Sequence, residues 1–162
     1  MTAPRAALTI GAVGLAAAMV TAPHAQADNK RLNSSVVANV DTIHQQAGCT
    51  TTIRMSPQLQ LAAQWHTDDV LNNSALDGNP GSDGSTPQDR ANAAGYRGKV
   101  NETVAINPAL AINNLDILHQ WYYDPVTYGV MADCASTQIG VWSENTLNRS
   151  VVVAVYGQPA TS

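Results

Sequence analysis

The stretch that decides the fold is LDGNPGSDGSTPQDRANAAGYRGKVNETVAIN, residues 76–107. It begins with a glycine-rich turn. Thr86-Pro87 then starts a short helix, because threonine can cap the first turn and proline suits the first helical position. Gly95 is typical of the residue that follows the end of such a helix. The first part of this stretch therefore predicts a loop followed by a short helix.

The second part of the stretch, residues 100–106, alternates as a half-buried strand does. Val100, Val104 and Ile106 share one face of this strand, and Glu102 lies on that same face. A buried carboxylate is costly unless it is paired with a cation, hydrogen-bonded or bound to a metal. Glu102 is therefore the first candidate for a functional residue.

The rest of the chain predicts three longer helices and a strand hairpin. The helices are expected over residues 33–47, from Ser56-Pro57 onward, and from Asn107-Pro108 to Asp124-Pro125, and the strands over residues 138–143 and 150–156. The predicted apolar stripes of the helices are Val36, Val40, Ile43 and Ala47; Leu59, Ala62, Ala63, His66 and Val70; and Ile112, Leu115, Leu118, His119 and Tyr122.

The N-terminal segment has the pattern of a secretory signal peptide. Arg5 supplies the positive charge, residues 6–20 form a short apolar run, and Ala25-Gln26-Ala27 matches a cleavage site. We expect a signal peptide over residues 1–27, one domain over residues 28–162, and export of the protein. The apolar run is short for a membrane span, so no transmembrane segment is expected.

Charge and cysteine content narrow the classes of partner. The formal net charge is −4 and no basic run occurs, which disfavours nucleic acid and anionic membranes. Cys49 and Cys134 are the two cysteines, and in an exported chain a disulfide between them is expected. On a chain-entropy model it would contribute about 4 kcal/mol. A catalytic cysteine is the alternative interpretation.

The order of these features resembles the CAP superfamily (cysteine-rich secretory, antigen 5 and pathogenesis-related-1 proteins, or SCP domains) in its bacterial branch. The resemblance implies an α/β (α+β) fold, the CAP-type α-β-α sandwich, with a small, mainly antiparallel sheet flanked by helices. The matching residues are Gly81-Ser82-Asp83-Gly84-Ser85, Pro87, Asp89-Arg90, Ala94-Gly95-Tyr96, Asn101-Glu102-Thr103-Val104-Ala105, residues 61–70, Ile139-Gly140-Val141 and Tyr156-Gly157.

The resemblance also implies a central cavity where two histidines and two acidic residues can hold a divalent metal. The two histidine positions fall on Asn79 (or Gly78) and Thr127, which are poor zinc ligands. Glu102 matches the first acidic residue, and Asp124 is the nearest carboxylate to the second. We therefore expect no metal cofactor. The predicted ligand cavity comprises Asn79, Glu102, Asp124, Thr127 and Tyr128.

Two histidines could rebuild a site around Glu102. His66 and His119 lie on the predicted apolar stripes of different helices, so each is either a hydrogen-bonded core residue or a catalytic or metal-binding partner of Glu102. Asp83 is either a hydrolytic acid or an Asx-turn residue. Asp89 and Arg90 are expected to pin the short helix to the loop through an ion pair or capping bonds.

Bulky side chains between Tyr122 and Met131 predict a groove for apolar ligands. Tyr122 and Tyr123 are adjacent, so on a helix they cannot share one face, and one is expected at the surface or a groove. The leading hypothesis is a secreted, non-catalytic CAP-domain protein that binds a small apolar or lipid-like ligand or an extracellular protein. The alternatives are a metal-dependent hydrolase of peptide or cell-wall material built around Glu102, and a structural envelope component.

Overall fold

The structure is a computed structural model that describes residues 24–160. Most of the predicted signal peptide lies outside these residues, so the signal peptide and its cleavage site remain predictions. No helix in the described part of the chain is long and apolar enough to cross a membrane.

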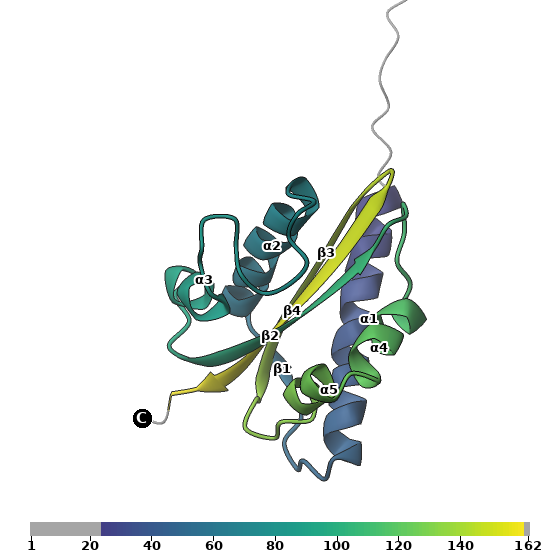
Figure 1. Cartoon of the computed structure of the whole chain (residues 1–162). Coiled ribbons are helices and arrows are strands. Elements are labelled where there is room, and N and C mark those ends of the chain that lie inside the picture. Colours follow the sequence, from purple (N-terminus) through teal and green to yellow (C-terminus); the bar gives the residue numbers. More distant parts are fainter. Residues whose placement is uncertain (1–23, 161–162) are drawn as a thin grey trace, which may run out of the picture.

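Four strands form one sheet between two layers of helices (Figure 1). β2 and β3 both pair antiparallel with β4, and the short β1 pairs parallel with β3. This confirms the α-β-α sandwich and its mainly antiparallel sheet. The helices are α1 (His24–Gln46), α2 (Pro57–Asn72), α3 (Pro87–Ala93), α4 (Asn114–Tyr122) and α5 (Pro125–Met131), and the strands are β1 (Arg54–Met55), β2 (Gly98–Asn107), β3 (Gln138–Thr146) and β4 (Arg149–Pro159).

The central strand β4 is covered on both faces. Its sequence is an almost continuous apolar run, as expected for a strand with helices on both sides. Each layer of helices encloses a separate hydrophobic cluster against the sheet. Its buried residues are Val151, Val153 and Val155 on the α2 and α3 side, and Val152, Ala154 and Tyr156 on the α1, α4 and α5 side.

The second predicted helix and the decisive stretch fold as expected, whereas α1 begins at His24, well before the predicted start at Asn33. Ser56 caps α2, and the whole predicted stripe of that helix is buried. Thr86 caps α3, and Gly95 has a φ of 88°, which a helix-ending glycine adopts at no steric cost. Of the stripe predicted for α1, Val36, Val40 and Ile43 are buried, whereas Ala47 is exposed.

The third predicted helix begins later than expected, and its predicted stripe is only partly confirmed. Ile112 is buried and Leu118 packs against the core, whereas His119 and Tyr122 are exposed. α4 starts after Asn113, whose side chain forms a capping box with Asp116. That local cap determines the first turn, and the residues that become buried are Ile117 and Trp121. Leu115 is instead 75 % exposed. Asp124 does not simply end the helix, because its carboxylate caps a further short helix, α5, which the sequence pattern did not predict.

The predicted disulfide is confirmed. Cys49 and Cys134 are bonded, with Cα atoms 5.2 Å apart and a sequence separation of 85 residues. The bond joins the end of α1 to the segment that follows α5. It thereby links the chain just after two helices of the same layer.

Gly140 lets α2 lie directly against β3. A Cβ atom at this position would overlap the backbone of Leu59 and Gln60 in α2. We expect Gly140→Ala to lower the free energy of unfolding by about 3 kcal/mol. The reason is that the backbone of α2 cannot move away from the added methyl group as the end of a flexible side chain could. Urea denaturation would measure the change.

Gly129→Ala is the matched control, since Gly129 lies in α5 with no heavy atom within 4 Å of the added Cβ. Alanine is the better helix former, so this variant should be more stable by about 1 kcal/mol. Equal effects of the two substitutions would show that α2 does not approach β3 as described.

Candidate functional site

Glu102 is buried beneath α2 and α3. It lies on β2, on the strand face predicted from the alternating pattern, and its side chain has no exposed area. Burial raises the pKa of Glu102 to about 7, although the neighbouring Arg90 acts in the opposite direction. The carboxylate therefore depends on its partners for stabilisation.

Arg90 of α3 provides most of that stabilisation. Its Nη2 atom donates to both Glu102 oxygens, at 2.9 and 3.1 Å, and to the carbonyl of Asn79 at 2.8 Å. Its Nη1 atom donates to the carbonyl and hydroxyl oxygens of Ser85, at 2.9 and 3.2 Å. One guanidinium thus joins α3, the strand β2 and the loop between α2 and α3.

His66 of α2 completes the cluster. Its Nε2 atom lies 2.9 Å from the carbonyl of Gly78 and 3.4 Å from a Glu102 oxygen. A carbonyl can only accept, so Nε2 carries the proton and donates it to Gly78. Burial lowers the pKa of His66 and the charge of Arg90 adds to the decrease, and both effects favour the neutral ring. His66 therefore does reach Glu102, but as a hydrogen-bonded core histidine.

The predicted cavity residues separate into two groups. Asn79, Glu102 and Thr127 line one hollow of about 520 Å³ beside β2. Asp124 is used as the cap of α5, where its Oδ1 atom accepts from the N–H groups of Val126 and Thr127. Tyr128 packs against the core cluster of the α1 layer and is not among the residues that line the hollow.

These residues do not fit a divalent metal. No group of three His, Cys, Asp or Glu side chains that could bind a metal occurs within residues 24–160. Both Glu102 oxygens already accept hydrogen bonds from Arg90, and the proton on His66 Nε2 is directed at a carbonyl. An ion at Glu102 would have to displace the guanidinium.

The glycine-rich loop is stabilised by its own acidic residues. Asp83 accepts from the N–H of Ser85 at 2.8 Å, the Asx-turn geometry, and bonding to Ser85 holds the pKa of Asp83 below its usual value. Asp69 of α2 accepts from the N–H and hydroxyl of Ser82, at 2.7 and 2.6 Å. Asp89 forms a capping box with Thr86. Asp83 is therefore a structural residue of the loop.

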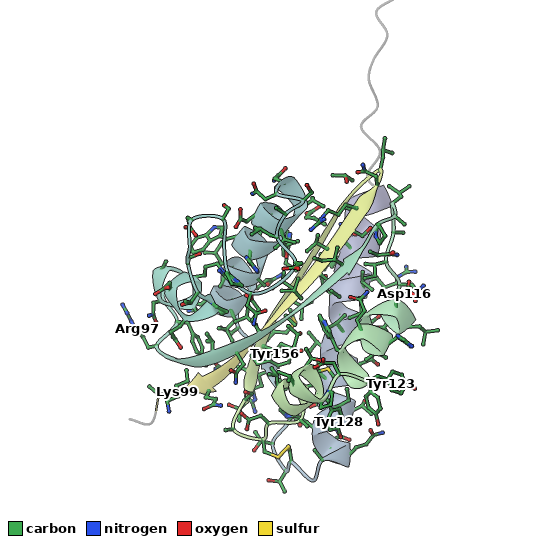
Figure 2. All side chains as sticks on the ribbon, in the orientation of Figure 1. Arg97, Lys99, Asp116, Tyr123, Tyr128 and Tyr156 are labelled. Carbon is green, nitrogen blue, oxygen red and sulfur yellow. A yellow bond between two sulfur atoms is a disulfide. The ribbon has the colours of Figure 1, made fainter. Side chains whose placement is uncertain are left out.

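A second hollow, of about 510 Å³, lies between α1 and α4, and we call it the aromatic groove. Tyr122 and Tyr123 are both exposed there, and Tyr123 projects outward from α4 (Figure 2). His119 lies here, with its ring 5.1 Å from that of Tyr123, and not beside Glu102. The groove is lined by Asn39, Thr42, Ile43, Gln46, Leu115, Leu118, His119, Tyr122 and Tyr123.

Sequence reasoning missed two features of these sites. It paired Arg90 with the loop and not with Glu102, although both residues were singled out. It also placed an apolar groove between Tyr122 and Met131, but only Tyr122 and Tyr123 of that range line the aromatic groove, and Met131 is fully buried. The contribution of α1 was not predicted, because its Thr42 and Gln46 lie outside the apolar stripe of that helix. The Arg90–Glu102 pair could have been predicted from one signal. A basic residue lies on a short helix, and the strand that follows carries one buried acidic residue.

The buried ion pair should show strong energetic coupling. We expect Arg90→Met alone to cost about 3–5 kcal/mol of unfolding free energy, because it leaves Glu102 buried without a cation. Arg90→Met combined with Glu102→Leu should cost clearly less than the sum of the two single changes. Denaturant titrations of the three variants would measure the cycle.

Arg97→Met is the control for loss of an arginine, since Arg97 is exposed, and it should change stability by less than about 0.5 kcal/mol. Additive costs at positions 90 and 102 would contradict the described pair.

Comparison with models of known families gives one match for this chain. A model of the family described as "CAP: Cysteine-rich secretory protein family" matches residues 30–156. A sequence comparison with curated proteins gives no match.

Solved structures similar in fold share little sequence with this chain. An outer surface protein of Borrelia burgdorferi has 15 % identity and a TM-score of 0.70, over 82 % of this chain and 96 % of its own. An extracellular SCP-domain protein of Bacillus anthracis has 12 % identity and a TM-score of 0.70, over 83 % of this chain and 42 % of its own. Venom allergen-like protein 4 of Schistosoma mansoni has 13 % identity and a TM-score of 0.51, over 80 % of this chain and 89 % of its own. The family match spans most of the sequence, and the chain therefore belongs to the CAP family of cysteine-rich secretory proteins.

Proposed function

We propose that this chain is a secreted, non-catalytic CAP-domain protein that binds a small apolar or lipid-like molecule in the aromatic groove. The observation that carries the proposal is the set of exposed apolar side chains that α4 presents there. Leu115 is 75 %, Tyr123 73 % and Tyr122 43 % exposed. Apolar side chains gathered at one hollow are typical of a binding surface.

The size and polarity of the groove suit a small amphipathic molecule. Its volume of about 510 Å³ lies in the range of small-molecule sites. Polar side chains of α1 and α4, namely Asn39, Thr42, Gln46 and His119, also line the groove. They can hydrogen-bond a polar end of the ligand, while the tyrosines and leucines contact its apolar body.

Secretion rests on the N-terminal pattern and on the disulfide. Arg5, residues 6–20 and Ala25-Gln26-Ala27 together match a cleavable signal. The bonded pair Cys49–Cys134 is stable in an oxidising compartment. Relatives of the same fold are described as an outer surface protein and an extracellular protein, which agrees with this location.

The absence of catalysis is inferred from the state of the buried cluster. A hydrolase built around Glu102 would need a free carboxylate and a histidine able to accept a proton. Here Glu102 is bound by Arg90, and the His66 nitrogen that lies near Glu102, Nε2, already donates to Gly78. The His66 nitrogen left to accept a proton, Nδ1, is buried. The geometry therefore favours a binding function over the metal-dependent hydrolase, and an extracellular protein is the alternative ligand for the groove.

Leu115→Asp should weaken ligand binding at least tenfold. It places a carboxylate at the rim of the groove, and an acidic residue in the first turn of α4 is compatible with the helix dipole. N-phenyl-1-naphthylamine, a neutral fluorescent apolar probe, would measure the affinity without a charge effect. Leu147→Asp is the matched control, because Leu147 is 85 % exposed at the distant hairpin tip.

Equal affinities of the two variants for the probe would count against the groove. Native mass spectrometry of protein from a secreting host provides a second readout. The proposal expects an apolar adduct that is absent under denaturing conditions, whereas a bare polypeptide would favour a protein ligand.

Chelation of divalent metal should leave the melting temperature unchanged to within about 1 °C. The reason is that Arg90, and not a metal, neutralises Glu102, and a metal that bound only the folded state would raise its stability. Differential scanning fluorimetry with and without EDTA would test this. A decrease of several degrees would show that a metal binds elsewhere or in place of the guanidinium, and hydrolysis should then be assayed.

A further inference from the structure

Strand β2 is an edge strand with one side free of the sheet. It pairs only with β4, and in an antiparallel pair the backbone groups of alternate residues point away from the partner. Hydrogen bonds to the carbonyls of Gly98 and Val104 and to the N–H of Ile106 come from side chains outside the sheet, which identifies the outward set. These outward groups belong to Gly98, Val100, Glu102, Val104 and Ile106.

Side-chain amides close both ends of this edge. Gln88 donates to the carbonyl of Gly98 and accepts from the N–H of Val100, at 2.9 and 3.1 Å. Gln120 accepts from the N–H of Ile106 and donates to the carbonyl of the same residue, at 3.2 and 3.1 Å. Each glutamine thus imitates a neighbouring strand, because a carboxamide offers the same donor and acceptor as a peptide group.

The middle of the edge has no such partner. Within residues 24–160, no hydrogen bond is formed by the carbonyl of Val100 or by the N–H groups of Glu102 and Val104. The carbonyl of Glu102 has only the side-chain amide of Asn79, at 3.5 Å. Unpaired strand groups favour the addition of a further strand.

This open stretch forms the floor of the hollow beside β2. Figure 1 shows α3 and α5 on opposite sides of the strand. The walls come from residues 77–79, from residues 86–88 at the start of α3, and from Val126, Thr127 and Val130 of α5. The floor therefore offers peptide hydrogen bonds, and one wall offers apolar side chains.

We propose that this hollow binds a short extended peptide, which pairs with the edge of β2 between Val100 and Val104. Recognition of this kind takes its affinity from main-chain hydrogen bonds and its specificity from the flanking walls. The valines of α5 favour β-branched apolar side chains in the peptide. The charged residues that line the hollow are Asp77 and Glu102. Glu102 is already bound by Arg90, whereas Asp77 is exposed at the rim, so a basic peptide is preferred.

A second copy of this chain fits the edge less well than a peptide. Full pairing of two β2 strands would have to displace both Gln88 and Gln120 from their backbone partners. The open stretch covers about five residues, which matches a short segment. This site is independent of the aromatic groove, because the two hollows share no lining residue.

Amide hydrogen exchange on the ¹⁵N-labelled, disulfide-bonded protein tests the proposal, with the peptide acetyl-Val-Lys-Val-Thr-amide as the probe. Without peptide, the amides of Glu102 and Val104 should exchange at least tenfold faster than those of Thr103 and Ala105, which face β4. Saturating peptide should slow exchange at Glu102 and Val104 at least tenfold and leave Thr103 and Ala105 unchanged.

The same peptide methylated at its backbone nitrogens is the matched control, and it should not bind, because it cannot donate to the strand edge. Asp77→Asn should weaken binding of the unmethylated peptide about threefold without changing the melting temperature. The proposal is overturned if the two amides are already protected in the free monomer, or if their protection depends on protein concentration, which indicates pairing of two copies. It is equally overturned if the methylated peptide binds as well, if the shifts map to the aromatic groove, or if no binding occurs at millimolar peptide.

Discussion

The contact between the guanidinium of Arg90 and the carboxylate of Glu102 is the interaction on which this half of the molecule depends. Each ion would cost several kcal/mol to bury alone. Together they stabilise each other, and the same guanidinium also satisfies the carbonyls of Asn79 and Ser85. Loss of the arginine would therefore leave a buried carboxylate and the carbonyl of Asn79 without their donor, while the carbonyl of Ser85 would keep only the N–H of Gly81. The loop, α3 and β2 are thus stabilised as one unit.

That arrangement also determines which chemistry the cavity can perform. An arginine is charged at any physiological pH and presents a fixed fork of donors, whereas a metal can dissociate and leave an open ligand position. With Glu102 held this way, and with the Nε2 atom of His66 donating to Gly78, the buried cluster keeps the solvent-shielded Nδ1 atom of His66 without a hydrogen-bond partner, and no group of three metal-binding side chains occurs within residues 24–160. Its role is to hold the walls of the hollow in place.

The two surfaces proposed for recognition differ in chemistry. The aromatic groove presents apolar side chains of α4 beside the polar side of α1 and suits an apolar molecule with one polar end. The edge of β2 presents unpaired peptide groups and suits an extended backbone. The aromatic groove presents Leu115 because the capping box at Asn113 sets the first turn of α4 with this side chain exposed. The edge of β2 is open because Gln88 and Gln120 cover only the ends of the strand.

The sequence by itself determined the elements whose signals are local. The caps at Ser56 and Thr86, the alternation around Glu102 and the spacing of the α2 stripe all depend on residues a few positions apart, whereas the sandwich was implied by the resemblance to the CAP superfamily. Only the tertiary structure decided the partner of Glu102, the buried face of α4 and the open groups of β2. Each of these depends on contacts between elements that are distant in the chain, and the choice among competing partners is made by packing and not by local pattern.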